Sequence, residues 1–194
     1  MSIVIIKYNA GNIQSVSFAL ERLGIDFSIT EEKEAIQKAD KVIFPGVGEA
    51  STTMKYLRER NLDSLISNLK QPVLGICLGM QLMCRHSAEN DVRCLGIFEE
   101  EVKRFEATAD MKVPHMGWNQ LRLTDGWINP AVDRQNAYFV HSYYVPVNRC
   151  TSAVTEYIVP FSAAMHRDNF YAVQFHPEKS AAAGELVLKS FLDL

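Results

Sequence analysis

The chain has 194 residues, of which 47% are hydrophobic and 22% charged, and its formal net charge is −3. This length and composition suit one globular domain. The acidic balance argues against a protein that binds nucleic acid or an anionic membrane. No apolar run is long enough for a signal peptide or a membrane span. Four cysteines without metal-type spacing indicate free thiols in a reducing cytoplasm, so we expect a cytoplasmic protein without a metal or a cofactor.

Strands and helices alternate through the first half of the chain. Short β-rich runs predict the strands, and apolar residues at helical spacing between them predict the helices. The predicted strands are Ile3–Ile6, Val42–Phe44 and Pro72–Ile76, and the predicted helices are residues 13–23, one or two helices across 49–70, and a helix that opens at 78–85. Because each strand is followed by a helix, the connections are crossovers, which predicts a mainly parallel sheet with helices on both faces.

The pattern changes at about Val92, where β-rich segments separated by polar turns replace the alternation. Residues 183–194 then predict a closing helix. No repeat, low-complexity segment or linker interrupts the sequence. We therefore expect one α/β domain over residues 1–194, with a mainly parallel open sheet of the flavodoxin type and additional antiparallel strands in the C-terminal half.

A cysteine stands between two glycines where the third strand turns into a helix, in the sequence GICLG from Gly75 to Gly79. The same pattern with serine marks the strained strand-to-helix turn that exposes the nucleophile of α/β hydrolases. The start of the following helix favours a thiolate and offers N–H groups to an oxyanion. Cys77 is therefore a candidate nucleophile, and a buried structural cysteine is the alternative for these five residues alone.

His176 is the candidate general base, because it ends a strand-like run and is followed by Pro177 and Glu178. The proline favours an extended His176, and residues two apart in an extended segment point to the same side. Glu178 can then orient the imidazole, as in a Cys–His–Glu triad. Taken alone, these three residues also fit a solvated turn after a strand.

The segment PGVG, Pro45 to Gly48, follows the second predicted strand and should lie on the same edge of the sheet as Cys77. Its glycines can turn a backbone N–H toward the thiol and complete an oxyanion hole. An ordinary strand-ending turn is the alternative. A phosphate-binding loop is excluded, because no Lys-Ser/Thr pair follows.

Five segments, in the order PGVG, GICLGMQ, PHMGWN, YFVHSY and QFHPEKS, resemble those of the class I (triad) glutamine amidotransferases. The resemblance covers essentially the whole chain, and PHMGWN together with PGVG and FVHSY makes it most similar to the glutaminase subunits of imidazole glycerol phosphate synthases. It implies that Cys77 attacks the side-chain amide of L-glutamine, that His176 acts as base and then as acid, and that Glu178 orients His176. It also implies a heterodimer with a (β/α)8 cyclase subunit, which uses the ammonia in histidine biosynthesis.

The resemblance assigns further residues to three groups. The implied oxyanion hole consists of backbone N–H groups of Val47, Gly48 and Leu78. The residues implied for glutamine binding are Gly46, Gly48, Gln81, His141, Ser142 and Tyr143. The residues implied at or near the partner interface are Asn12, Met116, Trp118, Tyr138 and Lys179.

Other interpretations remain open. Lys7 and Asn9 differ from the Asp-Tyr-Gly that many members have ahead of the AGN sequence. The same glutaminase chemistry could serve another ammonia acceptor, in surface-sugar amidation or in pyridoxal phosphate synthesis. A non-enzymatic flavodoxin-like module with Cys77 as a redox sensor is a third hypothesis, although it would not need Glu178, Gln81 or PGVG. Trp118 and Met116 could also be core residues.

Overall fold

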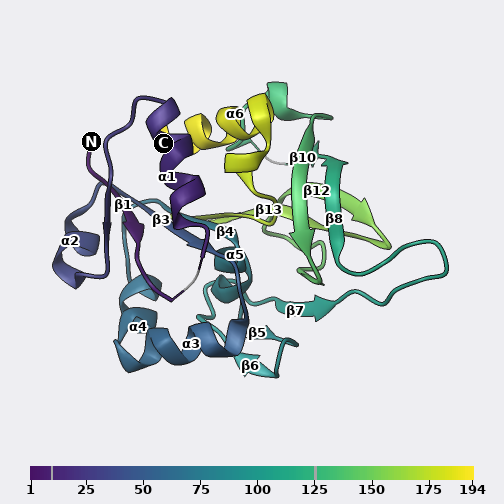
Figure 1. The fold of residues 1–194 in the computed structure, drawn as a ribbon, viewed down its shortest axis with the longest axis horizontal. Helices are drawn as coiled ribbons and strands as arrows, with labels where there is room; N and C mark the ends of the chain where they lie inside the picture. The colour runs from purple at the N-terminus through teal and green to yellow at the C-terminus, as the bar shows by residue number, and fades with distance from the viewer. Residues whose placement is uncertain (10, 125) are drawn as a thin grey trace.

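The computed structural model of the protein describes residues 1–9, 11–124 and 126–194, and its body is an eight-stranded sheet with helices on both faces (Figure 1). The strand order across the sheet is β2-β1-β3-β4-β14-β13-β12-β9. These strands are β1 (Ile3–Ile6), β2 (Ser28–Thr30), β3 (Lys41–Gly46), β4 (Val73–Cys77), β9 (Arg122–Leu123), β12 (Thr151–Tyr157), β13 (Val159–Arg167) and β14 (Phe170–Val173).

The sheet is parallel on one side and antiparallel on the other. β2, β1, β3, β4 and β14 pair in parallel. β13, β12 and β9 then continue the sheet in antiparallel orientation. The prediction of a mainly parallel sheet with antiparallel strands added in the C-terminal half is confirmed.

Two groups of helices cover the sheet (Figure 1). The apolar sides of α1 (Ile13–Arg22) and α6 (Ala181–Leu192) pack on one face. The other face is covered by α3 (Ala50–Glu59), α4 (Leu62–Ser67) and α5 (Leu78–Met83). Because both faces are covered, β1, β3 and β4 are buried along their whole length, which explains their nearly continuous apolar sequences.

Two smaller sheets lie beside the main one. β8 (His115–Gln120) and β10 (Asn136–His141) form an antiparallel two-stranded ribbon. The strands β11 (Tyr143–Tyr144), β7 (Glu101–Arg104), β5 (His86–Ser87) and β6 (Val92–Arg93) form a four-stranded sheet. The described ranges contain no helix that is both long and apolar enough to cross a membrane.

The edge of the sheet near the amino terminus contains two elements that the sequence pattern did not predict, β2 and α2 (Lys33–Lys38). β2 has only three residues, none of them buried, and α2 buries a single side chain, Ile36. Neither segment therefore shows the apolar periodicity on which the prediction depended. Boundaries of the predicted elements also differ by one or two residues. For example, β3 continues through Pro45 to Gly46 and α6 begins at Ala181.

Candidate active site

Cys77 is the last residue of β4 and directly precedes α5. Its backbone has φ 53° and ψ −106°, a region that residues with a side chain rarely adopt. Glycine is needed two residues later, because a Cβ on Gly79 would collide with the carbonyl oxygen of Phe44. The predicted strand-to-helix turn is present, and it places the thiol at the carboxyl edge of the sheet.

The strands on either side of β4 bring two other segments to Cys77. β3 pairs with β4 so that Gly46 lies opposite Cys77, which places Pro45–Gly48 beside the thiol, as predicted. On the other side, the register between β14 and β4 places Gln174, the first residue after β14, next to Cys77.

His176 and Glu178 form a buried pair. Nδ1 of His176 lies 2.7 Å from Oε1 of Glu178, and the solvent-accessible fraction of both side chains is 0%. Because a carboxylate only accepts hydrogen bonds, Nδ1 carries the proton, and Nε2 is left to face Cys77. Asn12 donates from Nδ2 to the same oxygen of Glu178 and so helps to hold the carboxylate in place.

The pKa of His176 is raised to about 10. Burial alone would lower this pKa, but the interactions of the imidazole with Cys77 and then with Glu178 outweigh burial. Nε2 makes no hydrogen bond of regular geometry to any residue that the structure describes, so its contact with the thiol is loose. Catalytic contacts are often loose before substrate binds, and the raised pKa of His176 keeps its imidazole protonated at neutral pH.

A pocket of about 410 Å³ opens at Cys77. Its lining residues are Val47, Gly48, Cys77, Leu78, Gln81, Glu89, Pro114, Val140, His141, Ser142 and Tyr143. The structure therefore brings together the residues predicted for glutamine binding and for the oxyanion hole. Gly46 is the exception, because it does not line the pocket, and an added Cβ on it would meet the hydroxyl of Tyr8. A pocket of this volume suits a small metabolite.

The carbonyl oxygen of Tyr143 organises one wall of the pocket. It accepts from Nε2 of Gln81 at 2.9 Å and from Nδ1 of His141 at 2.7 Å. Since Nδ1 of His141 is then the protonated nitrogen, its Nε2 accepts from Nδ1 of His115 at 3.0 Å. Nδ2 of Asn119 lies 3.3 Å from the remaining nitrogen of His115, which makes a continuous chain from β8 to the pocket.

Both histidines of this chain are neutral at physiological pH. Burial lowers the pKa of His115 to about 4 and the pKa of His141 to about 3. His115 is also stacked on aromatic rings, with centroid distances of 4.9 Å to Phe139 and 4.0 Å to Tyr157. His141 therefore contributes a fixed tautomer to the pocket and no charge.

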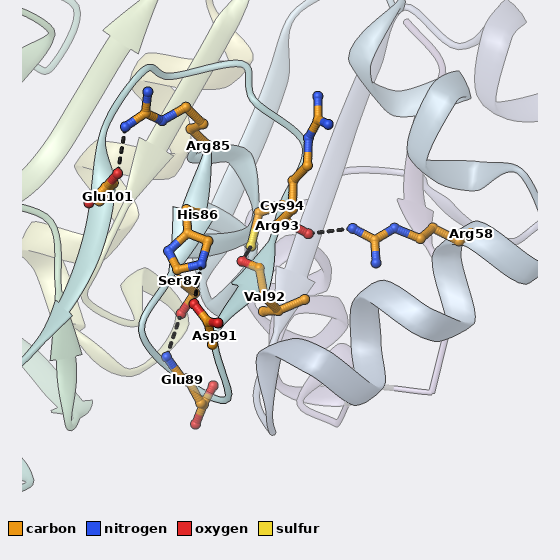
Figure 2. Close-up of polar contacts among 10 residues, drawn as sticks. All are labelled: Arg58, Arg85, His86, Ser87, Glu89, Asp91, Val92, Arg93, Cys94 and Glu101. Atoms are coloured by element: carbon orange, nitrogen blue, oxygen red, sulfur yellow. Dashed lines mark hydrogen bonds and ion pairs between the residues drawn. The ribbon is translucent and has the colours of Figure 1, made fainter.

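Two side chains hold the segment Pro45–Gly48 from its two ends. The buried hydroxyl of Tyr8 donates to the carbonyl oxygen of Pro45. Beyond the other end, the half-buried Glu89 accepts at 2.8 Å from the N–H of Ala50, the first residue of α3. Glu89 lies in the turn between β5 and β6, and Figure 2 shows the polar contacts of this turn. Burial raises the pKa of Glu89.

Four of the residues predicted for a partner interface form a cluster at the surface, which we call the ribbon surface: the exposed Met116, Trp118 and Lys179 and the half-buried Tyr138. Met116 and Trp118 are 64% and 56% exposed, so the interpretation of these two as core residues is wrong. Trp118 lies opposite Tyr138, with ring centroids 6.0 Å apart, and Nζ of Lys179 lies 6.0 Å from the centroid of Tyr138. The fifth residue, Asn12, contacts the His176–Glu178 pair through Glu178.

The remaining three cysteines are also free thiols. Burial raises the pKa of the Cys84 thiol well above its ordinary value and that of Cys94 to about 12. Cys150 is half-buried. In the part of the chain that the structure describes, no group of His, Cys, Asp and Glu side chains is arranged to hold a metal ion.

Comparison with known proteins agrees with this geometry. The model of the family described as glutamine amidotransferase class-I matches residues 5–193. The chain belongs to this family. It is 60% identical over 196 residues to the imidazole glycerol phosphate synthase subunit HisH of Bacteroides thetaiotaomicron, with 100% of both chains covered. It is 45% identical to the HisH subunit of Idiomarina loihiensis, with 100% of this chain and 98% of that protein covered.

Solved structures share the fold at much lower identity. A putative GMP synthase protein from Thermoplasma acidophilum has a TM-score of 0.74 at 17% identity and covers 100% of this chain and 93% of its own. The structure of PurLQS from Thermotoga maritima has a TM-score of 0.73 at 14% identity and covers 99% of this chain and 97% of that one. These similarities concern the fold alone.

In this glutamine amidotransferase, three residues near Cys77 are not among those predicted from the sequence: Glu89, Tyr8 and Gln174. No sequence feature marks Glu89 as a pocket residue, because it reaches the pocket from a polar turn. Tyr8 lies in the amino-terminal segment, where no feature of the sequence marks it as a neighbour of Cys77. Gln174 could have been found, because it stands two residues before His176 in an extended segment, and such residues point to the same side.

Proposed function

We propose that this chain is the glutaminase subunit of an imidazole glycerol phosphate synthase, a single amidotransferase domain over residues 1–194 that works in the cytoplasm. It hydrolyses glutamine to glutamate and ammonia and passes the ammonia to a separate (β/α)8 cyclase subunit of histidine biosynthesis. The observation that carries the proposal is the buried His176–Glu178 pair facing Cys77 at the pocket. The full-length relative at 60% identity, named as subunit HisH of that synthase, supports the choice of partner.

The reaction begins at Cys77, whose thiolate attacks the side-chain amide carbon of glutamine and turns the carbonyl oxygen into an oxyanion. The N–H of Leu78 and an N–H of Val47 or Gly48 stabilise this oxyanion. His176 gives a proton to the amide nitrogen, the C–N bond breaks, and ammonia leaves a thioester on the sulfur. His176 then takes a proton from water, and the water oxygen attacks the thioester to release glutamate and the thiolate.

The polarity of the pocket fits the amino-acid end of glutamine. Glu89 is the one charged side chain among the described lining residues, and its carboxylate is suited to the α-ammonium group. Gln81 donates both of its side-chain N–H groups, one to the Tyr143 carbonyl and one to Gln174, so its side-chain oxygen is left as an acceptor for the same ammonium group.

The composition of the ribbon surface favours the proposal that a protein partner binds there. It exposes two large apolar side chains, Met116 and Trp118, of types that are enriched at protein interfaces. The backbone of Tyr138 is tied to the general base, because the N–H of His176 donates to the Tyr138 carbonyl at 2.9 Å. Ser180 adds a second link, since its hydroxyl accepts from Tyr138 N–H at 2.9 Å and donates to the His176 carbonyl at 2.7 Å. A partner bound here would therefore contact the framework of the triad.

Reconstitution tests the proposal. The chain and the cyclase subunit of the same organism would be mixed, and the release of glutamate and the formation of imidazole glycerol phosphate would be measured together. We expect product from glutamine with the native chain, and product only from added ammonium with Cys77→Ala. If glutamine is hydrolysed but the cyclase does not use the ammonia, the acceptor is another enzyme, such as one of surface-sugar amidation or pyridoxal phosphate synthesis. Absence of hydrolysis in the mixture would contradict the proposal.

A further inference from the structure

Gln174 is fully buried and lies against the sulfur of Cys77. Its Nε2 is 3.7 Å from Sγ, within the range of an N–H···S hydrogen bond. The position follows from the sheet, because the β14–β4 register continues from Val173 and Ile76 to these two residues. Gln174 is thus a neutral polar group that contacts the reacting atom.

A backbone carbonyl determines which end of the Gln174 amide faces the sulfur. Nε2 of Gln81 lies 2.9 Å from the carbonyl oxygen of Tyr143, which only accepts, so this atom of Gln81 is the nitrogen. The same nitrogen lies 3.0 Å from the side chain of Gln174, and the atom that it meets must therefore be the oxygen. The other end of the Gln174 amide, which faces Sγ, is then the N–H donor.

We propose that Gln174 is a further catalytic residue, which donates a side-chain hydrogen bond to Cys77 Sγ and stabilises the thiolate. The inference rests on the proposed function, because it takes Cys77 as the nucleophile. A neutral thiol is a weak acceptor and a thiolate is a strong one, so a buried N–H at this place favours the ionised form. The same donor stabilises the sulfur again when the thioester breaks and the thiolate leaves.

Other groups around this thiol come from the elements packed against it. His176 faces Cys77 from the segment after β14, with Glu178 behind it. Tyr8 lies near the thiol from the end of β1, and its buried phenol is neutral because burial and then the charge of Cys77 raise its pKa. Glu89 lines the same pocket from the β5–β6 turn. His176 gives up its proton during the reaction, whereas the Gln174 amide keeps its donor throughout.

The test measures the pH dependence of Cys77 alkylation by iodoacetamide, with the modified peptide quantified by mass spectrometry. Gln174→Met keeps the approximate length of the side chain and removes the donor. We expect the midpoint of the alkylation profile to rise by about one pH unit, which corresponds to the usual energy of one hydrogen bond to a charged group. The acidic limb of kcat/KM for glutamine, measured with the partner, should rise by the same amount.

Two further variants separate this role from a structural one. Gln174→Glu keeps the bond from Gln81 and places a second acidic group against Sγ, so the alkylation midpoint should rise here as well. The matched control is Gln71→Met, because Gln71 donates its side-chain N–H to the Ile36 carbonyl at 2.8 Å, before the amino end of β4. This control should lower the unfolding temperature but leave the alkylation profile of Cys77 unchanged.

An alkylation midpoint that stays in place in either folded Gln174 variant would overturn the inference. If Gln174→Met does not fold, Gln174→Glu alone decides the question, because it retains the bond from Gln81. Failure of the proposed function looks different: the native chain would then show no glutaminase activity with its partner, whatever the alkylation profiles of the variants.

Discussion

The backbone at Cys77 adopts φ 53° and ψ −106°. Such a conformation costs roughly 1–3 kcal/mol for a residue with a side chain and persists only where the surroundings impose it. Here the parallel strands on both sides of β4 and the close approach of Gly79 to the Phe44 carbonyl impose it. The thiol therefore projects from a rigid part of the sheet, and its position relative to His176 is fixed before substrate arrives.

His176 should matter more than Glu178. His176→Ala removes the proton donor and acceptor and should lower kcat by about 10²–10⁴-fold, the usual worth of such a group. Glu178→Gln should have a smaller effect, because the amide oxygen can still accept from Nδ1 of His176. Steady-state glutaminase assays of both folded variants with the partner make the comparison. Equal and complete loss of glutaminase activity in the two variants would contradict this ranking.

Glu89→Gln should raise the KM for glutamine by roughly 10–100-fold with a smaller change in kcat, because it removes a charge that binds the part of the substrate that does not react. The amide oxygen of the variant can still accept from Ala50 N–H, so α3 should keep its position. Glu49→Gln is the matched control. Glu49 also caps α3, at Ser51 and Thr52, but does not line the pocket, so its KM should stay close to the native value. A KM that changes equally in both variants would show that Glu89 acts only through α3.

Among the secondary-structure elements, the ribbon of β8 and β10 joins the pocket to the exposed ribbon surface. His115 and Asn119 belong to β8 and point inward, whereas Met116 and Trp118 lie on the same strand and are exposed. The alternation of a β-strand therefore places the polar chain to Tyr143 and the partner surface on opposite sides of one element.

The two neutral histidines of the ribbon should make the fold sensitive to acid. Their pKa values in the folded chain, about 4 for His115 and about 3 for His141, lie below the ordinary 6.5. The unfolded chain therefore binds more protons below about pH 6.5, and stability is fully present above that pH and decreases as the pH falls toward the folded values. Each histidine can contribute a slope of at most about 1.4 kcal/mol per pH unit.

His115→Phe should reduce the pH dependence of stability by at most the contribution of one histidine. It should also lower stability at pH 7, because Nε2 of His141 then lacks its hydrogen-bond donor. Urea unfolding between pH 7 and pH 4.5 measures both effects. Asn119→Ala is the control, because it removes the last hydrogen bond of the chain but no titrating group, and its slope should equal that of the native chain. An unchanged slope in His115→Phe would contradict the assignment.

The sequence predicted the elements that local interactions determine better than those that depend on contacts between distant segments. Local signals were sufficient for β1, β3, β4 and the Cys77 turn, since a continuous apolar run or a pair of glycines marks each of them. β2 and α2 were missed, because their few buried side chains leave no periodic pattern. The His115–His141 contact could not be predicted, because it arises from the register of two strands that are far apart in the sequence.

Considered as a whole molecule, the chain gathers its candidate chemistry at one edge of the main sheet. β3, β4 and β14 are central parallel strands, and their carboxyl ends carry Pro45–Gly48, Cys77 and Gln174. The resemblance named these segments in order, but their mutual contacts follow from the strand order, which the sequence pattern left undetermined. The ribbon beside this edge then presents an exposed apolar surface next to the candidate triad.

Trp118→Ala should weaken binding of the cyclase subunit by roughly 30-fold or more, because a tryptophan at the centre of an interface commonly contributes at least 2 kcal/mol. The side chain is 56% exposed, so the stability of the isolated chain should hardly change. Ile29→Ala is the control, since Ile29 is 43% exposed on β2 at the opposite edge of the sheet. Calorimetric titration with the partner measures both affinities, and equal affinities would place the interface elsewhere.

Covalent capture of the nucleophile tests the central claim most directly. The chain, in complex with its partner, would be incubated with a diazo-ketone analogue of glutamine, and the adduct would be located by intact mass and peptide mapping. We expect one adduct per chain, on Cys77, with Cys84, Cys94 and Cys150 unmodified and with protection by excess glutamine. Glutaminase activity should fall in proportion to the labelled fraction. An adduct on another cysteine, or full activity after complete labelling of Cys77, would contradict the assignment of Cys77 as the catalytic nucleophile.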